Sequence, residues 1–99
     1  MNAKARELGL ENTSYVEPSG LSAENMSSAY DLARLIAYAA ADERIGSIMR
    51  KAAYTTQAGR ITITAHSTNQ IVRTGDIDVV GGKTGFIGRS GYCLATLLR

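Results

Sequence analysis

The spacing of apolar residues changes from helical to strand-like near Lys51, and this change constrains the fold more than any other feature of the sequence. In residues 28–50, leucine, isoleucine and alanine recur at intervals of three and four, which predicts helices. Beyond Lys51, β-branched residues alternate with polar ones on either side of Ala58-Gly59-Arg60, which predicts a β-hairpin. Residues 79–86 and 91–98 are two further predicted strands. The order along the chain is therefore helices first and antiparallel strands afterwards.

The helical half contains a short helix, a long loop and one strong helix. The first ten residues favour a helix that ends at Gly9, and the piece is so short that we expect it to be the tail of a longer helix. Residues 10–27 have turn chemistry, and a connection of this length tends to be functional. Ser28 is a predicted N-cap, with Asp31 bonding back to the helix start. Small residues on this helix allow another element to approach closely: Ala33, Ala37 and Ala40.

The strand half is rich in glycine at one place. Glycines within residues 79–86 predict the close approach of another backbone or of a ligand. Residues 91–98 are apolar enough to be a strand buried on both faces, which makes Cys93 a predicted core residue. Residues 66–72 fit neither a helix nor a strand clearly.

Composition excludes several classes of function. The net charge of +2 argues against nucleic-acid binding, which requires a clearly basic face. One cysteine excludes an internal disulfide and, with a single histidine, disfavours a structural zinc site. No run approaches the roughly 18–20 apolar residues of a membrane span, and no signal peptide opens the chain. We expect a globular chain of at most one domain, with neither a metal nor a cofactor.

The triplet Lys83-Thr84-Gly85 is the motif that carries chemistry. The ammonium attracts a carboxylate, the hydroxyl donates a hydrogen bond to it, and the glycine lets a substrate lie against the strand. The triplet belongs to the motif set of penicillin-interacting serine enzymes, together with Ser-x-x-Lys and Ser-x-Asn. By itself it is a weak signal, because an ordinary strand lysine beside a turn glycine gives the same letters.

Further blocks strengthen the signal, and with them the chain resembles the D-alanyl-D-alanine carboxypeptidases. These are low-molecular-mass penicillin-binding proteins with a serine β-lactamase-like fold. The blocks follow the order and spacing of that family over nearly all of the chain. They are residues 1–13 (similar to MNxKAxxLGxxNT), 17–21 (NPxGL), 28–33 (TAYDLA), 67–69 (in NTNxLL), 79–85 (VDGIKTG) and 91–94 (in AGYCLV).

The resemblance implies an α+β fold that is part of a β-lactamase/DD-peptidase-like domain, incomplete at both ends. Residues 1–99 would form a single partial domain, with a helical part at 1–50, including the loop 10–27, and a sheet part at 51–99. The implied activity is that of a serine-type carboxypeptidase, which trims the terminal D-alanine of peptidoglycan stem peptides through an acyl-enzyme and binds penicillin. The parent enzyme would act outside the cytoplasmic membrane, although this chain carries no targeting signal.

The resemblance also implies roles for four residues. Lys83 and Thr84 would bind the carboxylate of the D-Ala-D-Ala peptide or of a β-lactam, and Gly85 would give backbone clearance. The backbone N–H of Phe86 would be one oxyanion donor, the other being that of the nucleophilic serine. These residues would form one wall of a site, so the chain alone is expected to be inactive and to need the remainder of the catalytic domain as its partner.

The chain also departs from the family pattern. Ser-x-x-Lys is absent, because Met1, Ile48 and Val80 precede the three lysines by three residues. Ser67-x-Asn69 fits Ser-x-Asn in form but lies in another block, so we treat it as a decoy. Glu17 stands where the family usually has asparagine.

Two other functions stay open at this point: β-lactam hydrolysis on the same fold, and a non-catalytic fragment that self-associates by strand swapping. Other residues have simpler interpretations. His66 is expected to be a surface or loop histidine rather than a base. Asp76 and Asp78 fit a solvated turn, Arg89 fits an exposed turn, and Tyr54 with Tyr92 fits packing within a sheet.

Overall fold

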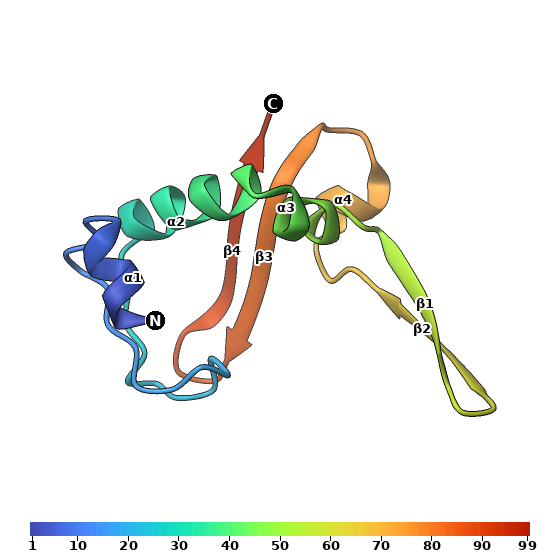
Figure 1. Cartoon of the computed structure of the whole chain (residues 1–99), viewed down its shortest axis with the longest axis horizontal. Coiled ribbons are helices and arrows are strands. Elements are labelled where there is room, and N and C mark those ends of the chain that lie inside the picture. Colours follow the sequence, from blue (N-terminus) through green and yellow to red (C-terminus); the bar gives the residue numbers. More distant parts are fainter.

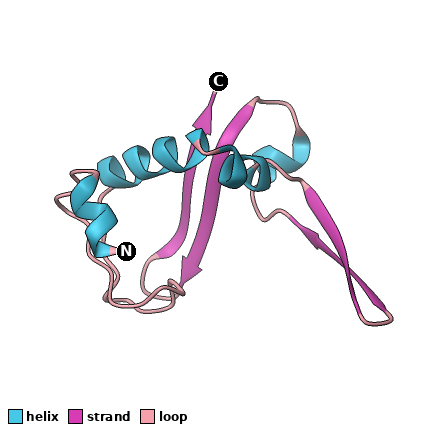
Figure 2. Cartoon of the chain, in the orientation of Figure 1, coloured by secondary structure: helices cyan, strands magenta, loops and turns pink.

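The secondary structure confirms the change from helices to strands. A computed structural model describes residues 1–99 and shows mixed helices and antiparallel strands (Figures 1 and 2). The helices are α1 (Asn2–Glu7), α2 (Ala29–Ala41), α3 (Glu43–Met49) and α4 (Gln70–Thr74). The strands are β1 (Ala53–Ala58), β2 (Ile61–His66), β3 (Val79–Ile87) and β4 (Gly91–Leu98). The segment that the sequence leaves ambiguous thus contains a short helix, α4.

The strands form two separate antiparallel sheets of two strands each. β1 pairs with β2, and β3 pairs with β4. The β1–β2 hairpin projects from the rest of the chain (Figure 1), and all of its strand residues are exposed. Neither face of this hairpin is buried. The β3–β4 sheet, in contrast, packs against α2 and α3. None of the four helices has the length and apolar character that crossing a membrane requires.

Helix α2 crosses the β3–β4 sheet at a point where both elements have small residues. A Cβ placed on Gly81 would lie 2.7 Å from Ala40 Cβ and 3.2 Å from Met49 Sδ. Glycine in β3 therefore permits a close approach to the helix, as the sequence predicts. Ile36, Ala40 and Val79 are buried around this crossing.

Asp31 fastens the loop 10–27 to α2. Ser28 caps the helix by accepting a hydrogen bond from the Asp31 N–H at 3.1 Å, as predicted. The Asp31 carboxylate, however, does not bond back to the helix start. It is only 2% exposed and accepts hydrogen bonds from the Asn12 N–H at 2.8 Å and the Thr13 hydroxyl at 2.7 Å. Its partners lie in the loop because that segment folds across the helix terminus.

Glu17 organises the outer part of the same loop. Its carboxylate accepts hydrogen bonds from Ser19, from the Ser22 N–H at 3.1 Å and from Asn25 Nδ2 at 2.6 Å. These bonds, foremost the one from the Ser19 hydroxyl, lower the pKa of the Glu17 carboxyl to about 2. The residue that departs from the family pattern is thus the hydrogen-bonding centre of the loop.

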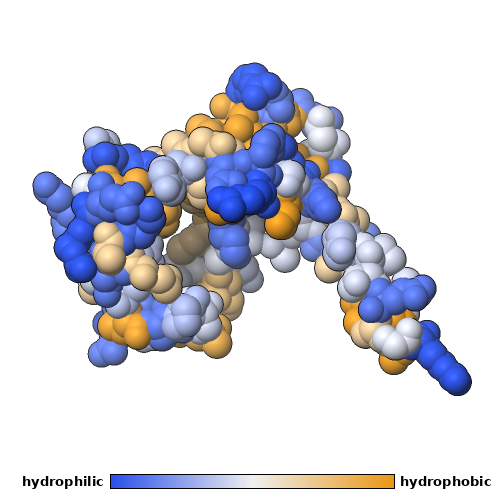
Figure 3. Space-filling view, in the orientation of Figure 1, coloured by the Kyte–Doolittle hydropathy of each residue, from blue (hydrophilic) through white to orange (hydrophobic).

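Strand β4 is not buried on both faces, and that expectation was wrong. Cys93 is exposed, Leu94 is 53% exposed and Tyr92 is 91% exposed. The helices cover the sheet near Gly81, whereas the end near the turn at 88–90 lies beyond that contact. Hydrophilic and hydrophobic residues are mixed over the visible face (Figure 3). Tyr54 and Tyr92 lie in different sheets, and Tyr92 instead packs on Phe86 with ring centroids 4.5 Å apart.

Candidate functional site

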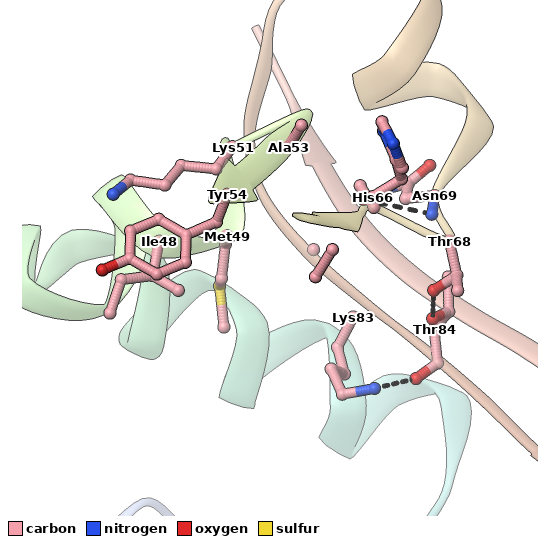
Figure 4. A pocket seen from close by; sticks show the side chains of 13 residues that line it. Ile48, Met49, Lys51, Ala53, Tyr54, His66, Thr68, Asn69, Lys83 and Thr84 are labelled. Atoms are coloured by element: carbon pink, nitrogen blue, oxygen red, sulfur yellow. Dashed lines mark hydrogen bonds between the residues drawn. The ribbon is translucent and has the colours of Figure 1, made fainter. Parts of the chain in front are cut away.

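A cavity of about 570 Å³ lies beside β3. The end of α3, the base of the β1–β2 hairpin, the segment 66–69 and β3 itself surround it. Figure 4 shows Ile48, Met49 and Tyr54 on one side, with Lys83 and Thr84 across from them. One wall is therefore apolar apart from Lys51, whose ammonium lies over the Tyr54 ring, and the opposite wall carries Lys83 and Thr84 of the triplet.

The charge of the cavity is entirely cationic. Lys51 and Lys83 are the charged residues that border it, and no aspartate or glutamate does. The ion pairs of the chain lie elsewhere and none of them includes Lys83: Lys4–Glu7, Arg44–Asp42, Arg50–Glu43 and Arg99–Asp78. The Lys83 ammonium donates to the backbone carbonyl of Thr84 (Figure 4). Since this bond leaves the positive charge unneutralised, the cavity suits an anionic ligand.

Strand β3 also borders a second hollow, of about 670 Å³, on which Gly85 and Phe86 lie. Lys83 and Thr84 border both spaces. A Cβ placed on Gly85 would meet no heavy atom within 4 Å, so the strand is open beside this residue. β3 pairs only with β4, which leaves its other edge free of strand pairing. The structure thus brings the four predicted site residues together, while their individual roles stay predictions.

The segment Ser67–Asn69 lies beside the triplet, and the sequence does not reveal this proximity. The Thr68 and Thr84 hydroxyl oxygens are 2.5 Å apart. Asn69 is 6% exposed, caps α4 through the Ile71 N–H at 3.1 Å, and donates to the Thr96 hydroxyl at 3.3 Å. Asparagine before a helix signals such a cap. No local pattern, however, signals a contact between residues sixteen positions apart.

Two polar residues at this wall, Ser67 and His66, are ones that the sequence does not predict to be catalytic. Ser67 borders the cavity, and its hydroxyl accepts a hydrogen bond from the Asn69 N–H at 3.2 Å. His66 ends β2 and is exposed, as expected, yet it also borders the cavity. No cluster of three or more histidine, cysteine, aspartate or glutamate residues that could hold a metal ion is present. The groups at hand are therefore an ammonium, hydroxyls and strand backbone, which together can bind a carboxylate.

Comparison with known proteins identifies the family of the chain. The model of the D-alanyl-D-alanine carboxypeptidase family, peptidase family S11, matches residues 1–97. The chain therefore belongs to this family.

Curated relatives are longer than the chain. It is 38% identical over 96 residues to a D-alanyl-D-alanine endopeptidase of Escherichia coli, covering 95% of this chain and 31% of the relative. It is 39% identical over 97 residues to the endopeptidase of the same name from Pseudomonas aeruginosa, with the same two shares. It is 36% identical over 99 residues to the D-alanyl-D-alanine carboxypeptidase DacF of Bacillus subtilis, covering 95% of this chain and 24% of that protein. The chain thus spans less than a third of each relative.

Solved structures confirm the fold. A penicillin-binding protein homologue from Mycobacterium tuberculosis superposes with a TM-score of 0.77 at 23% identity, covering 99% of this chain and 43% of the other. A D-alanyl-D-alanine carboxypeptidase from the same organism gives a TM-score of 0.76 at 23% identity, covering 99% and 42%. The resemblance in the sequence and its implied α+β fold are therefore both confirmed.

Proposed function

We propose that this chain supplies the carboxylate-binding wall in the active site of a D-Ala-D-Ala peptidase. In this role the Lys83 ammonium and the Thr84 hydroxyl bind the terminal carboxylate of a peptidoglycan stem peptide, or the carboxylate of a β-lactam. The observation that carries the proposal is the unpaired Lys83 ammonium in a cavity that no acidic residue borders. A charge-assisted pair is stronger than a neutral hydrogen bond, so a carboxylate gains most there.

The reaction we propose is acyl transfer through a serine outside this stretch, because the chain has no Ser-x-x-Lys motif. The serine oxygen bonds to the carbonyl carbon between the two D-alanines, and the C–N bond breaks as the departing amine takes up a proton. Water then hydrolyses the ester. We assign Phe86 as an oxyanion donor because one edge of β3 has no strand partner, and a backbone N–H on such an edge can donate to developing negative charge.

Carboxypeptidase activity and endopeptidase activity make different demands on this wall. A carboxypeptidase needs a group that recognises a charged terminus, and the unpaired Lys83 supports that assignment. An endopeptidase must accommodate peptide on both sides of the cut bond. It is the second candidate, favoured by the names of relatives at 38% and 39% identity. In either case we place the whole protein outside the cytoplasmic membrane, where peptidoglycan lies.

Titration of the isotope-labelled chain with N-acetyl-D-Ala-D-Ala, followed by NMR, tests the carboxylate site. Amide shifts at residues 83–86 are expected with the free carboxylate and not with the C-terminal amide. Lys83→Gln should weaken binding about tenfold or more, the worth of a charge-assisted bond. Lys4→Gln is the matched control, because it removes the same charge at a residue paired with Glu7 in α1, away from the cavity.

Two results would contradict the proposal. Equal affinity for the acid and the amide would show that the cavity does not recognise a carboxylate, and unchanged binding by Lys83→Gln would remove its main residue. Intact mass after incubation with a penicillin tests the missing nucleophile, and no adduct is expected on this chain alone. A stoichiometric adduct on Ser67 would show that the supposed decoy is the nucleophile.

A further inference from the structure

We propose that Thr68 is a positioning residue that directs the proton of the Thr84 hydroxyl toward the bound carboxylate. This inference rests on the proposed function, because it concerns how the same site binds its anion. It starts from the contact between the Thr68 and Thr84 hydroxyl oxygens at 2.5 Å, in which either oxygen can be the donor (Figure 4). No other side chain hydrogen-bonds to the Thr84 hydroxyl.

The chemistry of the ligand selects one direction for this bond. A hydroxyl has one proton to donate, and an ionised carboxylate only accepts. If Thr84 donates to a carboxylate, it cannot also donate to Thr68, so Thr68 must donate to Thr84. The result is a chain of hydrogen bonds from Thr68 through Thr84 to the ligand. Each bond in such a chain polarises the next, which strengthens the final bond to the anion.

Neighbouring residues hold Thr68 in place for this task. The Ser67 N–H donates to the Ala52 carbonyl at 2.8 Å, which ties the segment to the base of the β1–β2 hairpin. On the other side, Asn69 is buried and donates to Thr96 of β4 at 3.3 Å. Thr68 is therefore held on both sides, and its hydroxyl needs no large side-chain rearrangement to reach Thr84.

A glycine in β3 makes this arrangement possible. A Cβ on Gly82 would lie 3.2 Å from Asn69 Nδ2 and 2.9 Å from the Thr96 hydroxyl oxygen. A larger residue would thus crowd the Asn69–Thr96 bond that holds the segment against the sheet. Gly82 therefore lets the segment Ser67–Asn69 lie against β3, where Thr68 contacts Thr84.

The test compares binding of N-acetyl-D-Ala-D-Ala with binding of its C-terminal amide by the full chain and its variants. Thr68→Val removes the hydroxyl and keeps the shape of the side chain, so the preference for the acid should fall by about three- to tenfold. Thr68→Ser keeps the hydroxyl and should retain the preference. The chain offers a matched control in the hairpin, where the Thr55 and Thr64 hydroxyl oxygens are 2.9 Å apart. Thr55→Val removes a similar bond away from the cavity and should leave the preference unchanged.

Thr84→Val separates failure of the inference from failure of the proposed function. If Thr84→Val abolishes the preference and Thr68→Val leaves it at the original value, Thr68 does not position the proton and the inference is overturned, while the carboxylate site stands. If Thr84→Val retains the preference while Lys83→Gln abolishes it, Thr84 does not donate to the carboxylate and the inference is overturned, whereas the Lys83 site stands. If the unchanged chain shows no preference, the proposed function is overturned together with the inference. Thermal melts of each variant check that a loss of preference does not come from unfolding.

Discussion

Replacing Gly81 with alanine should loosen the packing of β3 against α2. The new Cβ would lie 2.7 Å from Ala40 Cβ and 3.2 Å from Met49 Sδ. Carbon atoms in contact prefer separations of about 3.5–4.0 Å, so the helix or the strand would have to move by nearly 1 Å. Overpacking of this kind costs about 1–3 kcal/mol, and a stiffer unfolded chain offsets about 0.4–1 kcal/mol of it. We expect a net loss of about 1–2 kcal/mol in the free energy of unfolding.

Urea and thermal unfolding, followed by circular dichroism, measure this loss. For a domain of this size each kcal/mol corresponds to about 4–8 °C in Tm. Gly85→Ala is the matched control, because it lies on the same strand and its Cβ would meet no heavy atom within 4 Å. The control should be close to neutral.

A double-mutant cycle with Ala40→Gly identifies the cause. If the two methyl groups collide, Ala40→Gly should cost less in the Gly81→Ala background than in the unchanged chain, with a coupling of about 1 kcal/mol or more. Strictly additive costs, or a Gly81→Ala variant as stable as Gly85→Ala, would refute the claim that this contact limits the packing of β3.

Three further predictions concern the loop and the exposed strand. The pKa of Glu17 is lowered to about 2 from an ordinary 4.5, so its hydrogen bonds stabilise the loop fully above pH 4.5 and are lost as the pH falls toward 2. Amide NMR shifts of residues 17–25 should change in that pH window, and Glu17→Gln should abolish the change. Asp31→Ala leaves the Asn12 and Thr13 donors without their acceptor and should cost about 2–4 kcal/mol in urea unfolding; a loss below about 1 kcal/mol would contradict this role. Cys93 should react with a thiol reagent as fast in the native chain as in urea, and strong protection in the native chain would show that β4 is covered.

Local patterns predicted the elements and one of the packing contacts. The hydroxyl of Ser28 caps α2 as expected, and the turn at Ala58-Gly59-Arg60 closes a hairpin in which Gly59 has a φ of +65°. Small residues near Ala40 and Gly81 predicted a close approach that the structure confirms. Each of these signals lies in a few consecutive residues, or in small residues that leave room for another element to approach.

Longer-range features could not be predicted in the same way. The exposure of Cys93 depends on where α2 crosses the sheet, and strand composition alone does not contain that information. The partners of Asp31 depend on the path of the loop across the helix terminus. The contact of Thr68 with Thr84 depends on how the chain between them, including α4, returns to the sheet. In each case the relevant neighbour is set by tertiary arrangement rather than by local preference.

The geometry of the site depends on a few specific contacts more than on a large core. Nine of the 99 residues are buried, and the accessible surface of 7353 Å² exceeds the roughly 5,400 Å² typical of a folded chain of this mass. Besides its pairing with β4, β3 is positioned by its contact with α2 at Gly81 and by the hydrogen bonds of the segment Ser67–Asn69. These contacts are made at Gly81, Gly82 and Thr84, directly beside Lys83. A change at one of these contacts should shift β3, and carboxylate preference should therefore respond to packing as well as to the charge of Lys83.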